Sequence, residues 1–172
     1  MRRFFKIAFC AAIVMSLFLS CAGTTAAKDS EAKTMNSTAS FTDVEGKEWQ
    51  LSEITSTGKN IIINRQKYET NFMGAYFSIS FMEESPQEGR IGGTGAPNRF
   101  FGPYTLEGSR GLSIGTVANT LMVAFNEPDE LKEREYFAYI SEVTRWDLAD
   151  GKLRLYSINK EGSEAILIFI TE

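Results

Sequence analysis

The chain has 172 residues, a formal net charge of −4 and no histidine. Its two cysteines, Cys10 and Cys21, both fall in the first 21 residues, so the chain beyond them has neither a thiol nor an imidazole. That composition excludes Ser-His-Asp and Cys-His catalysis, zinc sites of the Cys/His kind and disulfides from this region. We therefore expect one domain, with no cofactor, no metal and no enzymatic activity.

The first 20 residues have the pattern of a bacterial lipoprotein signal peptide. Three basic residues lie within residues 1–6, and an apolar run of 13 residues covers 7–19. A basic start, a short apolar region and small residues at a cut site mark a secretory signal, and a membrane-spanning helix would need ~20 apolar residues. Residues 18–21 are similar to the lipobox, in which the cysteine becomes the acylated first residue. We expect Cys21 to be lipidated, with palmitate among its acyl chains; an ordinary secretory signal with a chance cysteine is the alternative.

Loss of this leader would make the protein more acidic. It removes three of the 18 basic residues and leaves 15 against 22 acidic ones, a net charge of −7. An acidic protein is a poor ligand for nucleic acid and for anionic headgroups, so we expect membrane contact through the acyl chains alone. Residues 21–40 are small and polar and predict a flexible tether. The folded domain is predicted over residues 41–171, in the cell envelope, on the periplasmic side or at the outer membrane.

About eight short strands and one helix are predicted after the tether. The alternation of large apolar residues with their neighbours, which is typical of a strand, is clearest over residues 75–82. Asp150-Gly151 between two apolar segments predicts a hairpin. The nearly continuous apolar run of residues 165–170 predicts a strand that is central or buried on both faces. A helix is predicted to begin near Asn126 or Glu127, with Pro128 in its first turn.

A run of four charged residues in the predicted helix is expected to form its exposed face. These are Lys132, Glu133, Arg134 and Glu135.

Residues 90–124 form a glycine-rich centre with seven glycines. No Gly-Lys-Ser/Thr follows them, so they do not form a phosphate-binding loop; Gly92, Gly93, Gly95 and Gly102 are instead predicted to mark bulges and bends. Asn98 either contacts a ligand at a barrel mouth or, as its neighbours favour, stabilises a turn.

Three aromatic residues of the same segment have two interpretations. Phe100, Phe101 and Tyr104 either line an apolar pocket or fill the core, and the second interpretation is favoured. A barrel of eight strands is wide enough to hold one small ligand.

Five short patterns in order resemble a META domain, the small domain of heat-shock-inducible bacterial envelope proteins. They are Trp49-x-Leu51, Gly95-x-x-Asn98-x-x-x-Gly102-x-Tyr104, Thr120-x-Met122, the helix, and Leu153-x-Leu155. The resemblance implies a mainly β fold, small, antiparallel and barrel-like with a helix at one side, and no general enzymatic activity. Family members often carry two cysteines where this chain has Pro97 and Ala124, so a redox role of that pair does not carry over.

Three functions are compatible with these observations. The first is a lipid-anchored, stress-related envelope module that binds or supports envelope proteins. The second is a lipocalin-like carrier with a small apolar ligand in a barrel interior lined by Phe77, Phe81, Phe100 and Phe101. The third is an enzyme using carboxylates, which adjacent pairs such as Glu83-Glu84 do not favour, because neighbours on a strand point to opposite faces.

Overall fold

The computed structural model describes residues 38–65, 76–123 and 128–171. The predicted leader, the lipidation site Cys21, nearly all of the tether and the predicted helix start at Asn126 or Glu127 lie outside the described residues.

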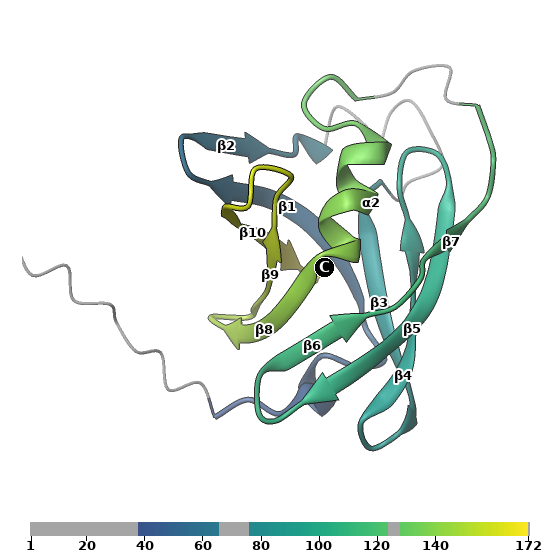
Figure 1. The fold of residues 1–172 in the computed structure, drawn as a ribbon, viewed down its shortest axis with the longest axis vertical. Coiled ribbons are helices and arrows are strands. Elements are labelled where there is room, and N and C mark those ends of the chain that lie inside the picture. Colours follow the sequence, from purple (N-terminus) through teal and green to yellow (C-terminus); the bar gives the residue numbers. More distant parts are fainter. Residues whose placement is uncertain (1–37, 66–75, 124–127, 172) are drawn as a thin grey trace, which may run out of the picture. The chain divides into compact units, whose positions relative to one another are not determined.

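Ten strands form one antiparallel sheet that closes on itself (Figure 1). The elements are η1 (Phe41–Asp43), β1 (Glu48–Ser56), β2 (Lys59–Ile62), β3 (Ser78–Ser85), β4 (Glu88–Thr94), β5 (Arg99–Glu107), β6 (Gly111–Ile114), β7 (Ala118–Asn119), α2 (Glu133–Ser141), β8 (Val143–Ala149), β9 (Lys152–Ile158) and β10 (Glu164–Ile170). The strand order is β10-β9-β8-β6-β5-β4-β3-β1-β2, and β10 also pairs with β1. Eight strands therefore close a barrel, while β2 and β7 pair with β1 and β5 outside it. The predicted mainly β, barrel-like fold with one helix is confirmed.

Local sequence signals account for several of these elements. Ile79 and Phe81 on β3 are fully buried, as their alternation predicts. Asp150 and Gly151 both have positive φ, 55° and 69°, which is the geometry of a two-residue hairpin turn between β8 and β9. Strand β10 lies between β9 and β1, so the prediction of a central strand is confirmed. The strand is not fully buried on both faces: its inward residues are buried, and the residues between them are partly exposed.

Helix α2 begins at Glu133, later than predicted. Lys132 precedes it in an extended conformation, and Leu131 is buried at 1 % exposure, so the segment before the helix anchors it to the core. The sequence predicts an apolar helix face of Leu131, Phe137, Ile140 and Val143. This prediction is partly wrong: the buried residues of the helix itself are Tyr136, Tyr139 and Ile140, whereas Leu131 and Val143 are buried outside it.

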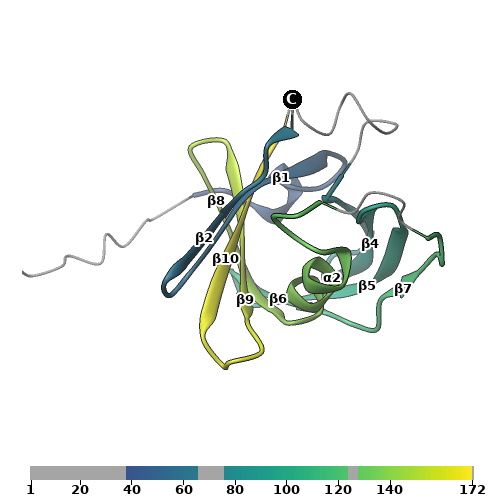
Figure 2. The same cartoon turned by 90° about the horizontal axis from the view of Figure 1, so that it is seen from above.

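Figures 1 and 2 show helix α2 lying over one end of the barrel. Buried aromatic rings fill the interior near α2 and near η1. At the α2 end, the ring of Tyr136 packs edge-on at 5.1 Å from Phe77 and 5.9 Å from Phe100. At the η1 end, Phe41 contacts three rings. These are Phe81 at 5.2 Å, Tyr104 at 5.5 Å and Trp146 at 4.9 Å. Edge-to-face pairs at these separations stabilise a core beyond the area they bury.

Candidate functional site

Asn98 joins three segments beside the barrel. Its side-chain amide donates to the Met122 carbonyl at 3.1 Å and to the Glu133 carboxylate at 2.7 Å. Its oxygen accepts from the Met122 amide at 2.6 Å and from the Thr120 hydroxyl at 2.9 Å. The residue is 5 % exposed. With both side-chain groups engaged by the protein, Asn98 acts as a structural link rather than as a free ligand contact.

Glu133 completes this link from the first turn of α2. Its Oε1 accepts hydrogen bonds from the backbone amides of Ala96 and Asn98, both at 2.6 Å. A Cβ added at Gly95 would lie 2.5 Å from the same oxygen, so glycine permits this approach. The prediction that Glu133 belongs to an exposed face is therefore wrong. Its carboxylate instead fixes the β4–β5 turn to the helix, through charge-assisted hydrogen bonds.

Two of the predicted aromatic residues pack over glycines of the neighbouring strand. Phe100 pairs with Gly93 and Tyr104 with Gly89. A Cβ at Gly93 would lie 2.1 Å from the Ser78 carbonyl oxygen and 2.7 Å from the Phe100 ring. The β4–β5 register is uninterrupted. The predicted bulges are therefore absent from this strand pair, and these glycines instead make room for rings.

Phe101 and Gly102 lie next to each other on β5 in different environments. Phe101 is 53 % exposed and faces outward, so it does not share the interior with Phe77, Phe81 and Phe100, which are buried. Gly102 is buried, and a Cβ there would lie 3.0 Å from the Thr116 carbonyl oxygen. Phe77 and Phe100 both pack on Tyr136, and Phe81 packs on Tyr104, whereas Phe101 contributes to the outer surface.

Tyr104 is the predicted site residue whose pKa is strongly shifted. Its hydroxyl donates to Glu45 at 2.5 Å. Burial raises the pKa of Tyr104 well above its ordinary value of 10.0, and the hydrogen bond and negative charge of Glu45 raise it further. Burial also raises the pKa of Tyr136, whose hydroxyl donates to the Ser78 carbonyl at 3.1 Å. Both phenols therefore stay neutral and donate structural hydrogen bonds within the protein.

An open groove lies outside the barrel, over α2. It has a volume of about 860 Å³ and is bordered by the β1–β2 turn, by α2 and by the β9–β10 turn. Its charged lining residues are Lys59, Lys132, Arg134, Glu135, Glu142, Lys160 and Glu161. Clefts of this size commonly hold a small molecule or a short peptide segment. We call this feature the α2 groove.

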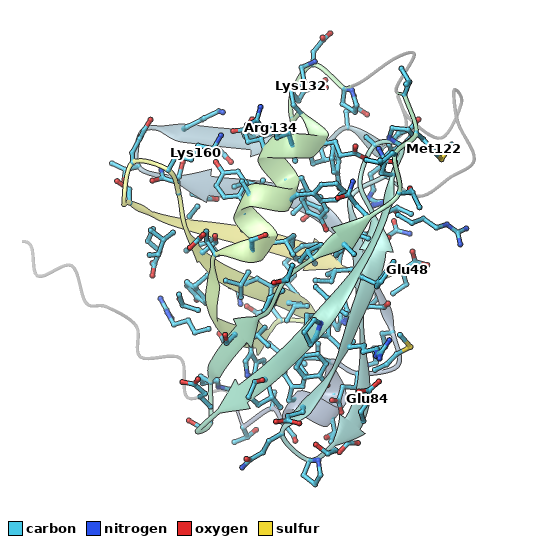
Figure 3. All side chains as sticks on the ribbon, turned by 45° about the vertical axis from the view of Figure 1, so that its right-hand side comes forward. Glu48, Glu84, Met122, Lys132, Arg134 and Lys160 are labelled. Carbon is cyan, nitrogen blue, oxygen red and sulfur yellow. The ribbon has the colours of Figure 1, made fainter. Side chains whose placement is uncertain are left out.

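A smaller hollow of about 310 Å³ adjoins the α2 groove across the outer face of the helix. The two share four lining residues, which are Arg134, Ala138, Ser141 and Lys160. Figure 3 shows Arg134 on α2, with Lys160 on the neighbouring β9–β10 turn and Lys132 just before the helix. Arg134 was predicted to be exposed, and it is. Lys160 was not singled out from the sequence, because its nearness to α2 depends on the fold.

The β9–β10 turn that carries Lys160 is held by Asn159. The Asn159 side-chain oxygen accepts from the amides of Glu161 at 3.0 Å and Ser163 at 2.8 Å. Gly162 takes a positive φ of 78° in the same turn. An Asn that bonds its own following backbone is a usual way to fix a turn. The residues Glu161-Gly162-Ser163 predict this turn from the sequence alone, whereas its position next to α2 depends on the fold.

Within residues 38–65, 76–123 and 128–171, no group of three acidic, cysteine or histidine side chains is arranged to hold a metal ion. Over the same ranges no helix is both long and apolar enough to cross a membrane.

These features define a closed antiparallel barrel with a helix at one end and an open groove outside it. The profile of the META domain family matches residues 42–169, so the chain belongs to the META domain family. A protein from Burkholderia xenovorans, whose structure was determined by NMR, is similar in fold with a TM-score of 0.55. It is 20% identical in sequence, over 76% of this chain and 85% of that one. A search of curated proteins gave no match.

Proposed function

We propose that this META domain protein is a lipid-anchored component of the bacterial cell envelope that binds another protein without catalysing a reaction. The observation that carries the binding function is the α2 groove, which three separate elements border outside the barrel. The leader and Cys21 support the location, on the periplasmic side or at the outer membrane. The tether before residue 41 would let the domain reach a partner away from the membrane surface.

The contacts inside the barrel favour this function over the carriage of an apolar ligand. The rings of Phe77, Phe81 and Phe100 are at most 2 % exposed and pack against other rings. Phe101, the fourth residue expected to line such an interior, lies on the outer surface. A ligand would have to displace packed aromatic contacts, which is costly in a close-packed core.

The anchor is tested by intact-mass spectrometry of the protein extracted from its native membrane. We expect a mature mass that begins at Cys21 and carries two or three acyl chains. A Cys21→Ala variant should lose the acyl mass and leave the membrane fraction. An unmodified mature mass from the natural sequence would contradict the anchor and make the protein a soluble exported one.

The binding function is tested separately with a photo-crosslinking amino acid at two positions of the full chain. Ala138 lies in the α2 groove, whereas Thr105 on β5 is exposed and lines neither hollow over α2. We expect one envelope protein to crosslink at position 138 and not at position 105. Equal crosslinking at both positions, or none at 138, would contradict a partner in the groove.

A further inference from the structure

We propose that the α2 groove binds an extended peptide segment by holding one of its acidic side chains between Arg134 and Lys160. This inference rests on the proposed binding function and assigns the chemical class of the ligand. The two cations come from different elements, α2 and the β9–β10 turn, and both border the two adjoining hollows (Figure 3).

Both cations border open space on the outer side of α2. Ala138 and Ser141, which line both hollows with them, lie one and two turns along α2 from Arg134. Their short side chains leave the helix surface accessible. Phe137 and Val117 form an apolar border of the smaller hollow. An acidic side chain could therefore bring its carboxylate to the cations and rest its methylene groups on this apolar border.

Arg134 and Lys160 differ from the other two cations of the α2 groove, which have carboxylate partners. Neither forms an ion pair within the part of the chain that the structure describes, whereas Lys59 pairs with Glu135 at 3.1 Å and Lys132 with Asp129 at 3.7 Å. The smaller hollow has Arg134 and Lys160 as its charged lining residues and no carboxylate among the lining residues. A pair of cations beside an apolar border, in a protein of net charge −4, is complementary to a single carboxylate.

The rest of the groove favours a peptide over a polyanion. Glu135, Glu142 and Glu161 line the larger hollow. These carboxylates would repel a chain of phosphates or a run of acidic residues, since like charges across an interface cost binding energy. A peptide of mixed charge avoids this repulsion, because its other residues can be neutral or basic. The groove volume of about 860 Å³ accommodates a few residues of such a segment.

The test uses the mature chain in detergent and pools of terminally blocked hexapeptides. The pools are identical except for a fixed central glutamate, glutamine or lysine, and inorganic phosphate is titrated as a separate probe. Binding is followed by the amide chemical shifts of Ala138 and Ser141. We expect saturable shifts with the glutamate pool, about fivefold weaker binding with the glutamine pool, and a further loss with lysine. Added salt should weaken binding of the glutamate pool more than binding of the other two pools.

Matched variants test whether the two cations cause this preference. Arg134→Gln and Lys160→Gln should each weaken binding of the glutamate pool about fivefold, so that it binds no more tightly than the glutamine pool. Lys152→Gln is the control, since Lys152 is exposed at the start of β9 and lines neither hollow over α2. Equal binding of all three pools would overturn the inference that the ligand is acidic, while the groove would still be a binding site. No binding of any pool, or tighter binding of phosphate than of the glutamate pool, would overturn the peptide ligand. The acylation of Cys21 is independent of these outcomes.

Discussion

Asn98 and Glu133 meet side chain to side chain, with the amide nitrogen of one 2.7 Å from a carboxylate oxygen of the other. They are 35 residues apart in the chain, and the contact joins the β4–β5 turn to the first turn of α2. Met122 and Thr120 add a third segment through the Asn98 oxygen. The helix that borders the α2 groove is thus positioned by a buried polar residue as well as by its aromatic face.

We expect Asn98→Ala to destabilise the fold by about 3 kcal/mol, because four side-chain hydrogen bonds are lost and their partners are left poorly satisfied. Urea denaturation measures this loss directly. Asn60→Ala is the control, since Asn60 is exposed on β2, and it should change the free energy of unfolding by less than about 0.5 kcal/mol. A similar loss in both variants would show that the link around Asn98 contributes nothing specific.

Adjacent glycines on β4 should respond in opposite ways to substitution by alanine. A Cβ at Gly93 meets the Ser78 carbonyl oxygen at 2.1 Å, whereas a Cβ at Gly92 finds its nearest neighbour, the Ser80 hydroxyl, at 3.6 Å. We expect Gly93→Ala to cost about 2 kcal/mol or more through strain. Gly92→Ala should be neutral or slightly stabilising, because it restricts the unfolded chain. Thermal denaturation of the two variants measures this difference. Equal melting temperatures would contradict the close packing of Phe100 on Gly93.

The turn between β8 and β9 offers a second backbone test. Gly151 has a φ of 69° and open space around it, so Gly151→Ala should cost about 1 kcal/mol through backbone strain alone. Asp150→Asn should leave stability nearly unchanged, because asparagine tolerates the same left-handed conformation. Both changes are measured by urea denaturation. A neutral Gly151→Ala would mean that the turn relaxes to another type.

Features set by neighbours in sequence could be predicted, whereas features set by strand register could not. The Asp150-Gly151 hairpin and the buried face of β3 follow from local turn chemistry and alternation. The requirement for glycine at position 93 depends on its pairing with Phe100 across two strands. The helix start was likewise not predictable from Pro128 and its neighbours, because α2 begins only at Glu133, after Leu131 has been buried in the core.

The candidate site shows the same division. The residues around Asn98 predict its role in a turn, but the local charge pattern predicts an exposed helix face for its partner Glu133, because that pattern carries no information about contacts distant in sequence. Arg134 and Lys160 come together through the closure of the barrel, which places the β9–β10 turn next to α2. Long-range closure of this kind leaves no periodic signal in the sequence, so the α2 groove could only be found in the structure.

Alkaline unfolding provides the last prediction, and its sign follows from the raised pKa of Tyr104. The unfolded chain releases the phenolic proton near pH 10, whereas burial and Glu45 keep the proton on folded Tyr104 to a higher pH. Below the unfolded pKa the two states bind the same number of protons, so the stabilising effect of the neutral phenol is fully present. Above it the unfolded state has lost a proton that the folded state retains, and stability falls as pH rises.

We therefore expect the urea midpoint of the natural protein to fall between about pH 9 and about pH 11, with a steeper slope than that of Tyr104→Phe. The variant loses the hydrogen bond to Glu45 and should start lower at neutral pH, but it has one fewer buried phenol to ionise. Tyr136, whose pKa burial also raises, remains in both proteins and contributes equally to both curves. Absorbance of tyrosinate, recorded in the same samples, reports ionisation directly. Parallel midpoint curves would show that Tyr104 ionises at the same pH in the folded and unfolded chain, contrary to its buried contact with Glu45.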